Sequence, residues 1–182
     1  DPARRESYDW AAGEGRFLDT PAILLDNQTR ASQPGIRVYR VFQPAVESAP
    51  LLVELGWLPL PGDRRMPGVA LPSGEVTVSG LLVAPPSAGI ATPVAAPQAD
   101  GNLLLIGLDH AVLSAALDMP TLAPRVLKLD PALPLGYTRD LDILPNTLPP
   151  ERHLGYAVQW FGLALAVFIT ALLLTLRRRR QR

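Results

Sequence analysis

The longest apolar stretch of the chain is a run of 23 residues without a charged side chain, LGYAVQWFGLALAVFITALLLTL, from Leu154 to Leu176. As an α-helix the run is about 35 Å long, which exceeds the roughly 30 Å hydrocarbon core of a bilayer. Helices in the cores of soluble proteins rarely run this far without a charge. We therefore expect one transmembrane helix at 151–176, followed by a basic tail at 177–182.

Residues 1–150 show a different pattern, in which short apolar or alternating stretches are separated by segments rich in proline and glycine. In 36–42 the even-numbered residues share one face and the odd-numbered residues the other, and both faces mix apolar and polar side chains. The run LLVELGWL at 51–58 is nearly continuous and predicts a central strand that is covered on both sides. The expected strands are 15–18, 23–27, 36–42, 51–58, 75–83, 103–106, 125–130 and, less clearly, 137–144.

One soluble helix is expected at 109–118, with Asp109 as its N-cap. We expect Ala111, Leu113, Ala115 and Leu117 to lie mostly toward a partner element. Setting aside the less clear stretches, about six or seven strands, one helix and 20 prolines predict an α+β, mainly β, domain at 1–150. Its fold is expected to be an antiparallel β-barrel or sandwich, elaborated by loops at 59–74 and 85–100.

Charge is distributed unevenly along a chain whose formal net charge is zero. Residues 151–182 hold six arginines and one glutamate, so 1–150 carry a net charge of −5, which argues against nucleic-acid binding there. The RRRR cluster at 177–180 directly follows the apolar run and predicts a cytoplasmic C-terminus. The 1–150 domain is then an ectodomain, in the periplasm of a bacterium. Because an exported domain needs a preceding signal or helix, we expect a membrane segment before Asp1.

The inventory of reactive groups is short. The chain has no cysteine and two histidines, so thiolate sites are excluded and a histidine-based zinc site has too few ligands. No HExxH, GxSxG or phosphate-binding glycine loop occurs. His110 is expected to be an exposed or half-buried residue in the first turn of the soluble helix. We expect no enzyme activity.

His153 is distinguished by its position at the start of the expected span. At helical spacing its face continues through Tyr156, Ala157, Trp160 and Ala164. An imidazole beside an aromatic ring and small residues can ligate the iron of a flat, apolar macrocycle that lies against the helix. Alternatively, His153 is an interfacial polar residue and Trp160 belongs to an aromatic belt. Gly155, Gly162 and the alanines can also form a close contact with another helix.

The run PERHLGYAVQWFGLA at 150–164 resembles the C-terminal signature of the Surfeit-locus-one (Shy-type) family of cytochrome c oxidase biogenesis proteins. Other stretches agree in order along the chain, and Leu55 departs from the arginine that family members often have before the Gly-Trp pair. The agreeing stretches are GRF at 15–17, LLDN at 24–27, PG at 34–35 with RV at 37–38, LVELGWLP at 52–59, EVTVSG at 75–80 and GY at 136–137 before Asn146.

The resemblance implies two membrane helices that bracket an ectodomain, and a role in delivering or inserting haem a into subunit I of the oxidase. It implies that His153 contacts haem and is its metal ligand, with Trp160 and Tyr156 beside it. The implied partners are subunit I and other oxidase assembly factors, in the bacterial inner membrane. Two alternatives remain, which are a structural assembly factor that binds subunit I without holding haem, and a membrane-tethered periplasmic enzyme.

Overall fold

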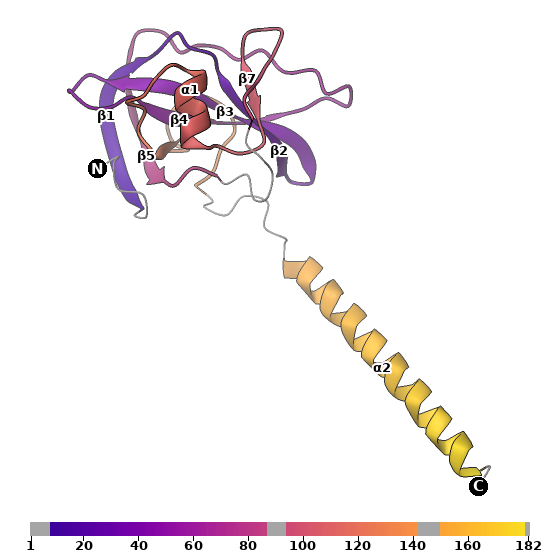
Figure 1. Cartoon of the computed structure of the whole chain (residues 1–182). Helices are drawn as coiled ribbons and strands as arrows, with labels where there is room; N and C mark the ends of the chain where they lie inside the picture. The colour runs from indigo at the N-terminus through magenta and orange to yellow at the C-terminus, as the bar shows by residue number, and fades with distance from the viewer. Residues whose placement is uncertain (1–7, 87–93, 142–149, 181–182) are drawn as a thin grey trace. The chain divides into compact units, whose positions relative to one another are not determined.

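The computed structural model describes residues 8–86, 94–141 and 150–180, and the side chains of 150–152 are not described. The chain divides into two compact units, Asp1–Pro145 and Asn146–Arg182. The first unit, called the β unit below, holds eight strands and the short helix α1, and the second holds the helix α2 (Figure 1). This arrangement confirms the predicted class, α+β and mainly β with a long apolar C-terminal helix.

The strands of the β unit form one sheet in the order β1-β5-β8-β4-β3-β2-β7-β6. An additional pairing between β1 and β3 closes the first five of these strands into a barrel. Two pairings are parallel, β4 with β8 and β2 with β7, and the other pairings are antiparallel. The elements are β1 (Asp9–Phe17), β2 (Ile23–Arg30), β3 (Gln33–Pro44), β4 (Leu51–Pro59), β5 (Glu75–Val83), β6 (Ala96–Pro97), β7 (Leu103–Leu105), α1 (His110–Ala116), β8 (Val126–Leu129) and α2 (Pro150–Arg180).

Two hydrophobic cores lie on the two faces of the sheet. Phe17, Phe42 and Val53 belong to the core inside the barrel. Tyr39, Val41 and Leu52 belong to the second core, which includes Leu113 of α1 and residues of β2 and β7. Figure 1 shows α1 lying across the strands. Because β4 has buried residues on both faces, the expectation that 51–58 is covered on both sides is confirmed.

β4 meets β3 through a bulge that shifts the register by one residue. Val38 pairs with Gly56 and Tyr39 pairs with Glu54, so Leu55 is the extra residue. Gly56 has φ +126°, a conformation that glycine adopts without strain. A side chain at Gly56 would also meet the main chain of Tyr137 and Thr138 at 2.7–2.8 Å. The glycine of the Gly-Trp pair therefore allows the bulge in the central strand.

Most expected strands are present within a few residues, and three expectations need correction. β1 begins at Asp9 rather than residue 15, because its first half is recruited by pairing with β5. In place of the expected strand at 137–144, the described residues form one isolated β-bridge, between Thr138 and Trp57. Residues 142–144 lie outside the described residues. β6 lies within the expected loop at 85–100.

A further correction concerns the buried face of α1. Leu113 and Leu117 are buried, four residues apart, whereas Ala111 and Ala115 are exposed. A helix repeats every 3.6 residues, so the alternate-residue spacing assumed for the alanines does not hold there. The N-cap is as expected, since the Asp109 carboxylate accepts a hydrogen bond from the backbone N–H of Val112 at 3.0 Å.

A buried ion pair joins the two central strands on the face of the second core. The Arg37 guanidinium donates from Nη1 to Glu54 Oε1 at 2.6 Å, and the Tyr39 hydroxyl donates to Glu54 Oε2 at 3.1 Å. The side chains of Arg37 and Glu54 are 14% and 5% exposed. The pKa of Tyr39 is raised well above its usual value by burial and by the Glu54 carboxylate, so the phenol stays protonated and donates.

We predict that removing one member of this pair is far more costly than removing an exposed one. Arg37→Met and Glu54→Leu should each lower the free energy of unfolding by about 3–5 kcal/mol, because each leaves a buried charge without its counter-charge. The double variant should cost at least about 1 kcal/mol less than the sum of the two singles. Denaturant unfolding of the four proteins measures the coupling.

The control is Arg65→Met, which breaks the exposed pair between Arg65 and Asp63, whose side chains are 87% and 54% exposed. That substitution should cost less than about 1 kcal/mol. Additive costs at Arg37 and Glu54, or an equal cost at Arg65, would contradict this account.

Candidate functional site

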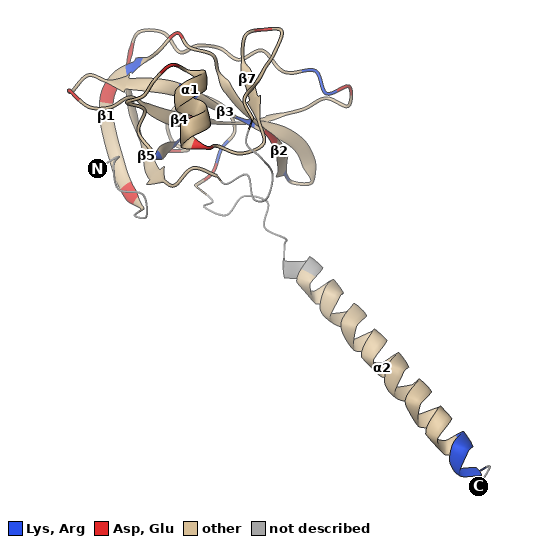
Figure 2. Cartoon of the chain, viewed as in Figure 1, with Lys and Arg blue, Asp and Glu red and all other residues tan. Residues whose placement is uncertain are grey.

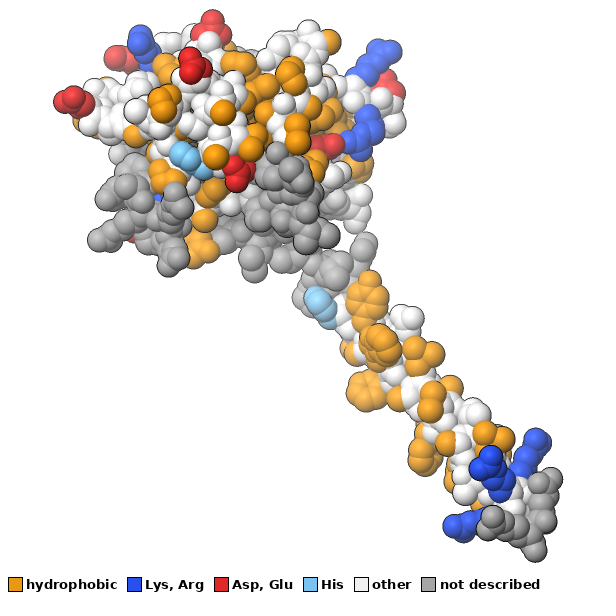
Figure 3. All heavy atoms as spheres, in the orientation of Figure 1, with side chains coloured by type: hydrophobic (Ala, Val, Ile, Leu, Met, Phe, Trp, Pro, Cys, Tyr) orange, Lys and Arg blue, Asp and Glu red, His pale blue; other side chains and the backbone are white. Residues whose placement is uncertain are grey.

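α2 runs from Pro150 to Arg180 as one continuous helix. Proline is favoured at the first position of a helix, because the N–H that it lacks has no partner within the helix there. Among the described residues α2 is the one helix long and apolar enough to cross a membrane, over His153–Arg180, and no part of its apolar window is buried. Figure 3 shows hydrophobic side chains projecting around its length. α2 is therefore suited to anchor the chain in a membrane.

Four arginines of this unit lie in the last turn of α2. Arg177 to Arg180 fill that turn, which is blue on the ribbon in Figure 2, and the 23 residues before it, from Leu154 to Leu176, carry no charge. Positive charge at a helix C-terminus also interacts favourably with the helix dipole. The helix thus has one apolar body and one cationic end.

The candidate cofactor face lies on the first turns of α2. His153, Tyr156 and Trp160 are all within the helix, and all are exposed, Tyr156 at 51% and Trp160 at 71%. At 100° per residue His153 and Trp160 lie within about 20° of one direction and roughly 10 Å apart along the axis. On the same side of the helix, Ala157 lies between His153 and Trp160, and Ala164 lies one turn after Trp160. This set is called the His153 face.

A second face of α2, nearly opposite the His153 face, is made of small residues and one amide. Gly155, Gly162 and Ala166 lie there with Gln159. A Cβ added at Gly155 or at Gly162 would meet nothing within 4 Å. The two glycines were expected on this face, whereas Gln159 was not singled out, because an uncharged polar residue does not interrupt a run defined by the absence of charge.

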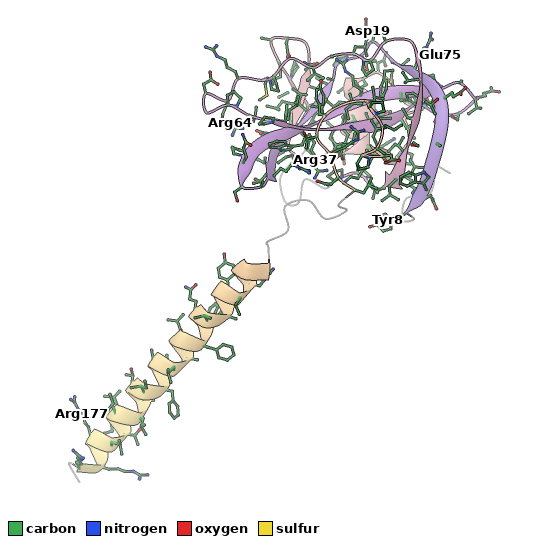
Figure 4. All side chains as sticks on the ribbon, turned by 180° about the vertical axis from the view of Figure 1, so that it is seen from behind. Tyr8, Asp19, Arg37, Arg64, Glu75 and Arg177 are labelled. Carbon is green, nitrogen blue, oxygen red and sulfur yellow. The ribbon has the colours of Figure 1, made fainter. Side chains whose placement is uncertain are left out.

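The β unit offers no candidate metal site among its described residues. No group of three or more His, Asp or Glu residues there is placed to hold a metal ion. His110 is half-buried, as expected, and its Nε2 lies 2.6 Å from the Leu122 carbonyl oxygen. Arg64 lies on a loop, as expected, and Arg37 lies among the strands (Figure 4).

Two buried arginines, Arg40 and Arg125, and the half-buried Arg139 were also missed, and each is hydrogen-bonded within the β unit. Arg125 is fully buried and donates to Asp9 at 2.8 Å and to the Leu82 carbonyl at 2.7 Å. Arg40 donates to the Thr20 and Val69 carbonyls, and Arg139 donates to four carbonyls between Asp130 and Tyr137. A guanidinium has five N–H donors, so it can donate hydrogen bonds to loop carbonyls that are not paired within the sheet. In the sequence, each of these arginines lies within or beside an apolar run, and that position was the available sign of a structural role.

Comparison with known proteins gives one match. The model of the SURF1 family matches residues 1–165, which include the whole described β unit and the first half of α2. No curated protein and no solved structure gives a significant match. The match covers the residues of the His153 face.

The family is linked to cytochrome c oxidase assembly, and it is an assembly-factor family rather than a known class of enzymes. Association with components of the oxidase follows from that role. With its family signature over 165 residues and an apolar helix suited to a membrane, the chain belongs to the SURF1 family, whose members are linked to the assembly of cytochrome c oxidase.

Proposed function

We propose that this protein supports the delivery or insertion of haem a into subunit I of cytochrome c oxidase, with His153 as an axial ligand of the iron. The observation that carries the proposal is the His153 face, on which an imidazole and two aromatic rings are exposed on an apolar helix of a family linked to oxidase assembly. Subunit I and other oxidase assembly factors are the proposed partners.

The residues of the His153 face fit one side of a haem. A neutral imidazole is a common axial ligand of haem iron. The aromatic rings of Tyr156 and Trp160 offer flat apolar surface for contact with a macrocycle, and Ala157 and Ala164 are small enough to let it approach the helix. When bound, haem a supplies a redox-active iron centre.

A single helix with one histidine covers only one side of a macrocycle. His153 and His110 are the two histidines of the chain, and His110 is engaged with the Leu122 carbonyl. Any ligand on the other side of the ring would come from outside residues 1–182. This arrangement favours transient holding and transfer over permanent storage.

A cofactor-free assembly factor is the second candidate function. It is favoured by the face of α2 that carries Gly155, Gln159 and Gly162, since small residues let two membrane helices approach closely and an amide can hydrogen-bond across them. In this function the span docks on subunit I, and His153 is an interfacial polar residue. The two functions differ in whether the purified protein carries haem.

We predict that His153→Ala abolishes haem a binding without loss of the protein. Alanine is the best helix former, so α2 should persist while the strongest bond to the iron is removed. Trp160→Phe should weaken occupancy or shift the spectrum, because phenylalanine keeps part of the stacking surface. The measurement is haem a content per protein after purification from membranes of cells that make haem a, together with terminal-oxidase activity.

His110→Ala is the matched control, because it removes the other histidine and should leave the haem a content unchanged. Both histidine variants must first be shown to reach the wild-type level in membranes. If His153→Ala retains its haem a, axial ligation by His153 is refuted and the cofactor-free function is preferred.

We also propose that residues 1–150 lie in the periplasm and that 177–182 lie in the cytoplasm, in the inner membrane of a bacterium. Arginines beside an apolar span are retained on the cytoplasmic side. We predict that a reporter fused after Arg182 is active only if it functions in the cytoplasm. Activity of an export-dependent reporter at that position would reverse the orientation.

A further inference from the structure

The His153 face of α2 is flanked by different side chains on its two sides. At 100° per residue, Tyr156 lies about 60° to one side of the direction of His153. Ala157 and Phe161 lie about 40° and about 80° to the other side. One flank therefore presents a phenol, and the other flank presents only hydrocarbon. A flat macrocycle held by His153 meets this difference along its two lateral edges.

The helix leaves the hydroxyl of Tyr156 free, whereas it satisfies the hydroxyls of the two threonines in the span. The Thr170 hydroxyl donates to the Ala166 carbonyl oxygen at 2.8 Å. The Thr175 hydroxyl donates to the Ala171 carbonyl oxygen at 2.8 Å. Tyr156 is 51% exposed, and its hydroxyl makes no hydrogen bond within the described part of the chain. Because the phenol carries its O–H at the far end of the ring, that donor is available to a bound molecule.

Tyr156 is also close to His153 along the helix. Residues three apart are neighbours on a helix surface, and the Cα atom of Tyr156 is about 4.5 Å farther along the axis than that of His153. Helical side chains lean toward the N-terminus, so a long ring covers the turn before its own Cα atom. For Tyr156 that turn is the one that holds His153. The phenol therefore lies beside the imidazole, and Trp160 lies roughly 10 Å deeper along the axis.

The substituents of haem a limit how the macrocycle can be turned about the bond between its iron and an imidazole. Its two adjacent propionates are charged, so they point to the water boundary next to His153. Its long isoprenoid chain, on the opposite edge, points into the hydrocarbon. The two lateral edges then differ. One carries a formyl and a methyl group, and the other carries only a methyl and a vinyl group.

The lateral edges of haem a and the flanks of the His153 face match in polarity. When the imidazole binds one of the two faces of the ring, the formyl edge lies on the Tyr156 flank and the hydrocarbon edge lies on the flank of Ala157 and Phe161. The opposite ring face would place the formyl oxygen against hydrocarbon, and an unpaired polar group in apolar surroundings is unfavourable. Haem o carries a methyl group in place of the formyl group, so it gains nothing from the phenol.

We propose that the Tyr156 hydroxyl donates a hydrogen bond to the formyl oxygen of haem a, and that this bond makes the His153 face selective for haem a over haem o. The inference rests on the proposed axial ligation by His153, and it assigns to Tyr156 the recognition of one substituent of the macrocycle. A single hydrogen bond of this kind contributes roughly a three- to tenfold preference.

The experiment titrates the full chain, purified without haem and placed in lipid nanodiscs, with haem a and with haem o. The absorbance of the Soret band gives the two dissociation constants, and empty nanodiscs serve as the blank. Tyr156→Phe keeps the ring and removes only the hydroxyl. In this variant the ratio of the haem o constant to the haem a constant should fall roughly three- to tenfold. Comparing ratios cancels the effect of the formyl group on the iron, because that effect is the same in both proteins.

Resonance Raman spectroscopy gives a second readout. A hydrogen bond lowers the stretching frequency of a carbonyl group, so the formyl band of bound haem a should move to higher frequency in Tyr156→Phe. The matched control is Tyr8→Phe, which removes the hydroxyl of a tyrosine that is 59% exposed and precedes β1. That variant should leave both the ratio and the formyl band unchanged.

The same titrations distinguish the role of Tyr156 from the proposed function. His153→Ala should weaken the binding of both haems, because both are ligated through the iron. If binding depends on His153 but Tyr156→Phe changes neither the ratio nor the formyl band, the role of Tyr156 is overturned and the haem proposal stands. If the wild type binds neither haem, or if His153→Ala binds both as tightly as the wild type, both proposals are overturned.

Discussion

Three residue pairs between β1 and β3, at Gly15, Arg16 and Phe17, close the sheet of the β unit into a barrel. The approach is close enough that any side chain at Gly15 would collide with the main chain of β3. Immediately beyond, the rings of Phe17 and Phe42 meet edge to face with centroids 5.2 Å apart. Glycine admits the partner strand, and the aromatic pair then fills the space that closure encloses.

Closure gives the sheet an inside and an outside, and each acquires its own core. The long strand β3 contributes residues to both cores. Its first part pairs with β2, and its last residues pair with β1. β4, next to it, is buried on both faces and carries the only glutamate of the chain that is buried among the described residues. Arg37 and Tyr39 satisfy that carboxylate from the neighbouring strand. The Glu54 carboxylate thus joins β3 and β4 through directed hydrogen bonds, which an apolar side chain at that position would not make.

Local pattern was sufficient for most of this architecture and for the candidate cofactor face. Alternation in 36–42 placed Val38 and Val41 in separate cores, and the chemistry of Asp109 placed the start of α1. The helical period alone placed His153 and Trp160 on one side of α2. Whether haem binds there is a chemical question that spacing does not answer.

The features that could not be predicted depend on partners distant in sequence. Residues 9–13, DWAAG, lack the branched side chains typical of strands and become β1 only because β5 pairs with them. The partner of Glu54 lies on another strand, 17 residues away, so the run LLVELGWL suggested no buried ion pair.

The position of β8 in the sheet determines the order in which the β unit can be completed. β8 is the last strand in the described part of the chain, yet it lies between β4 and β5 and pairs with both. Until residues 126–129 are present, both of those strands have an open edge, and open edges recruit other chains. Pairing over such sequence separation is also slow, because a long loop must close first. In a nascent chain, both edges therefore stay open until β8 is made, shortly before the synthesis of α2 begins.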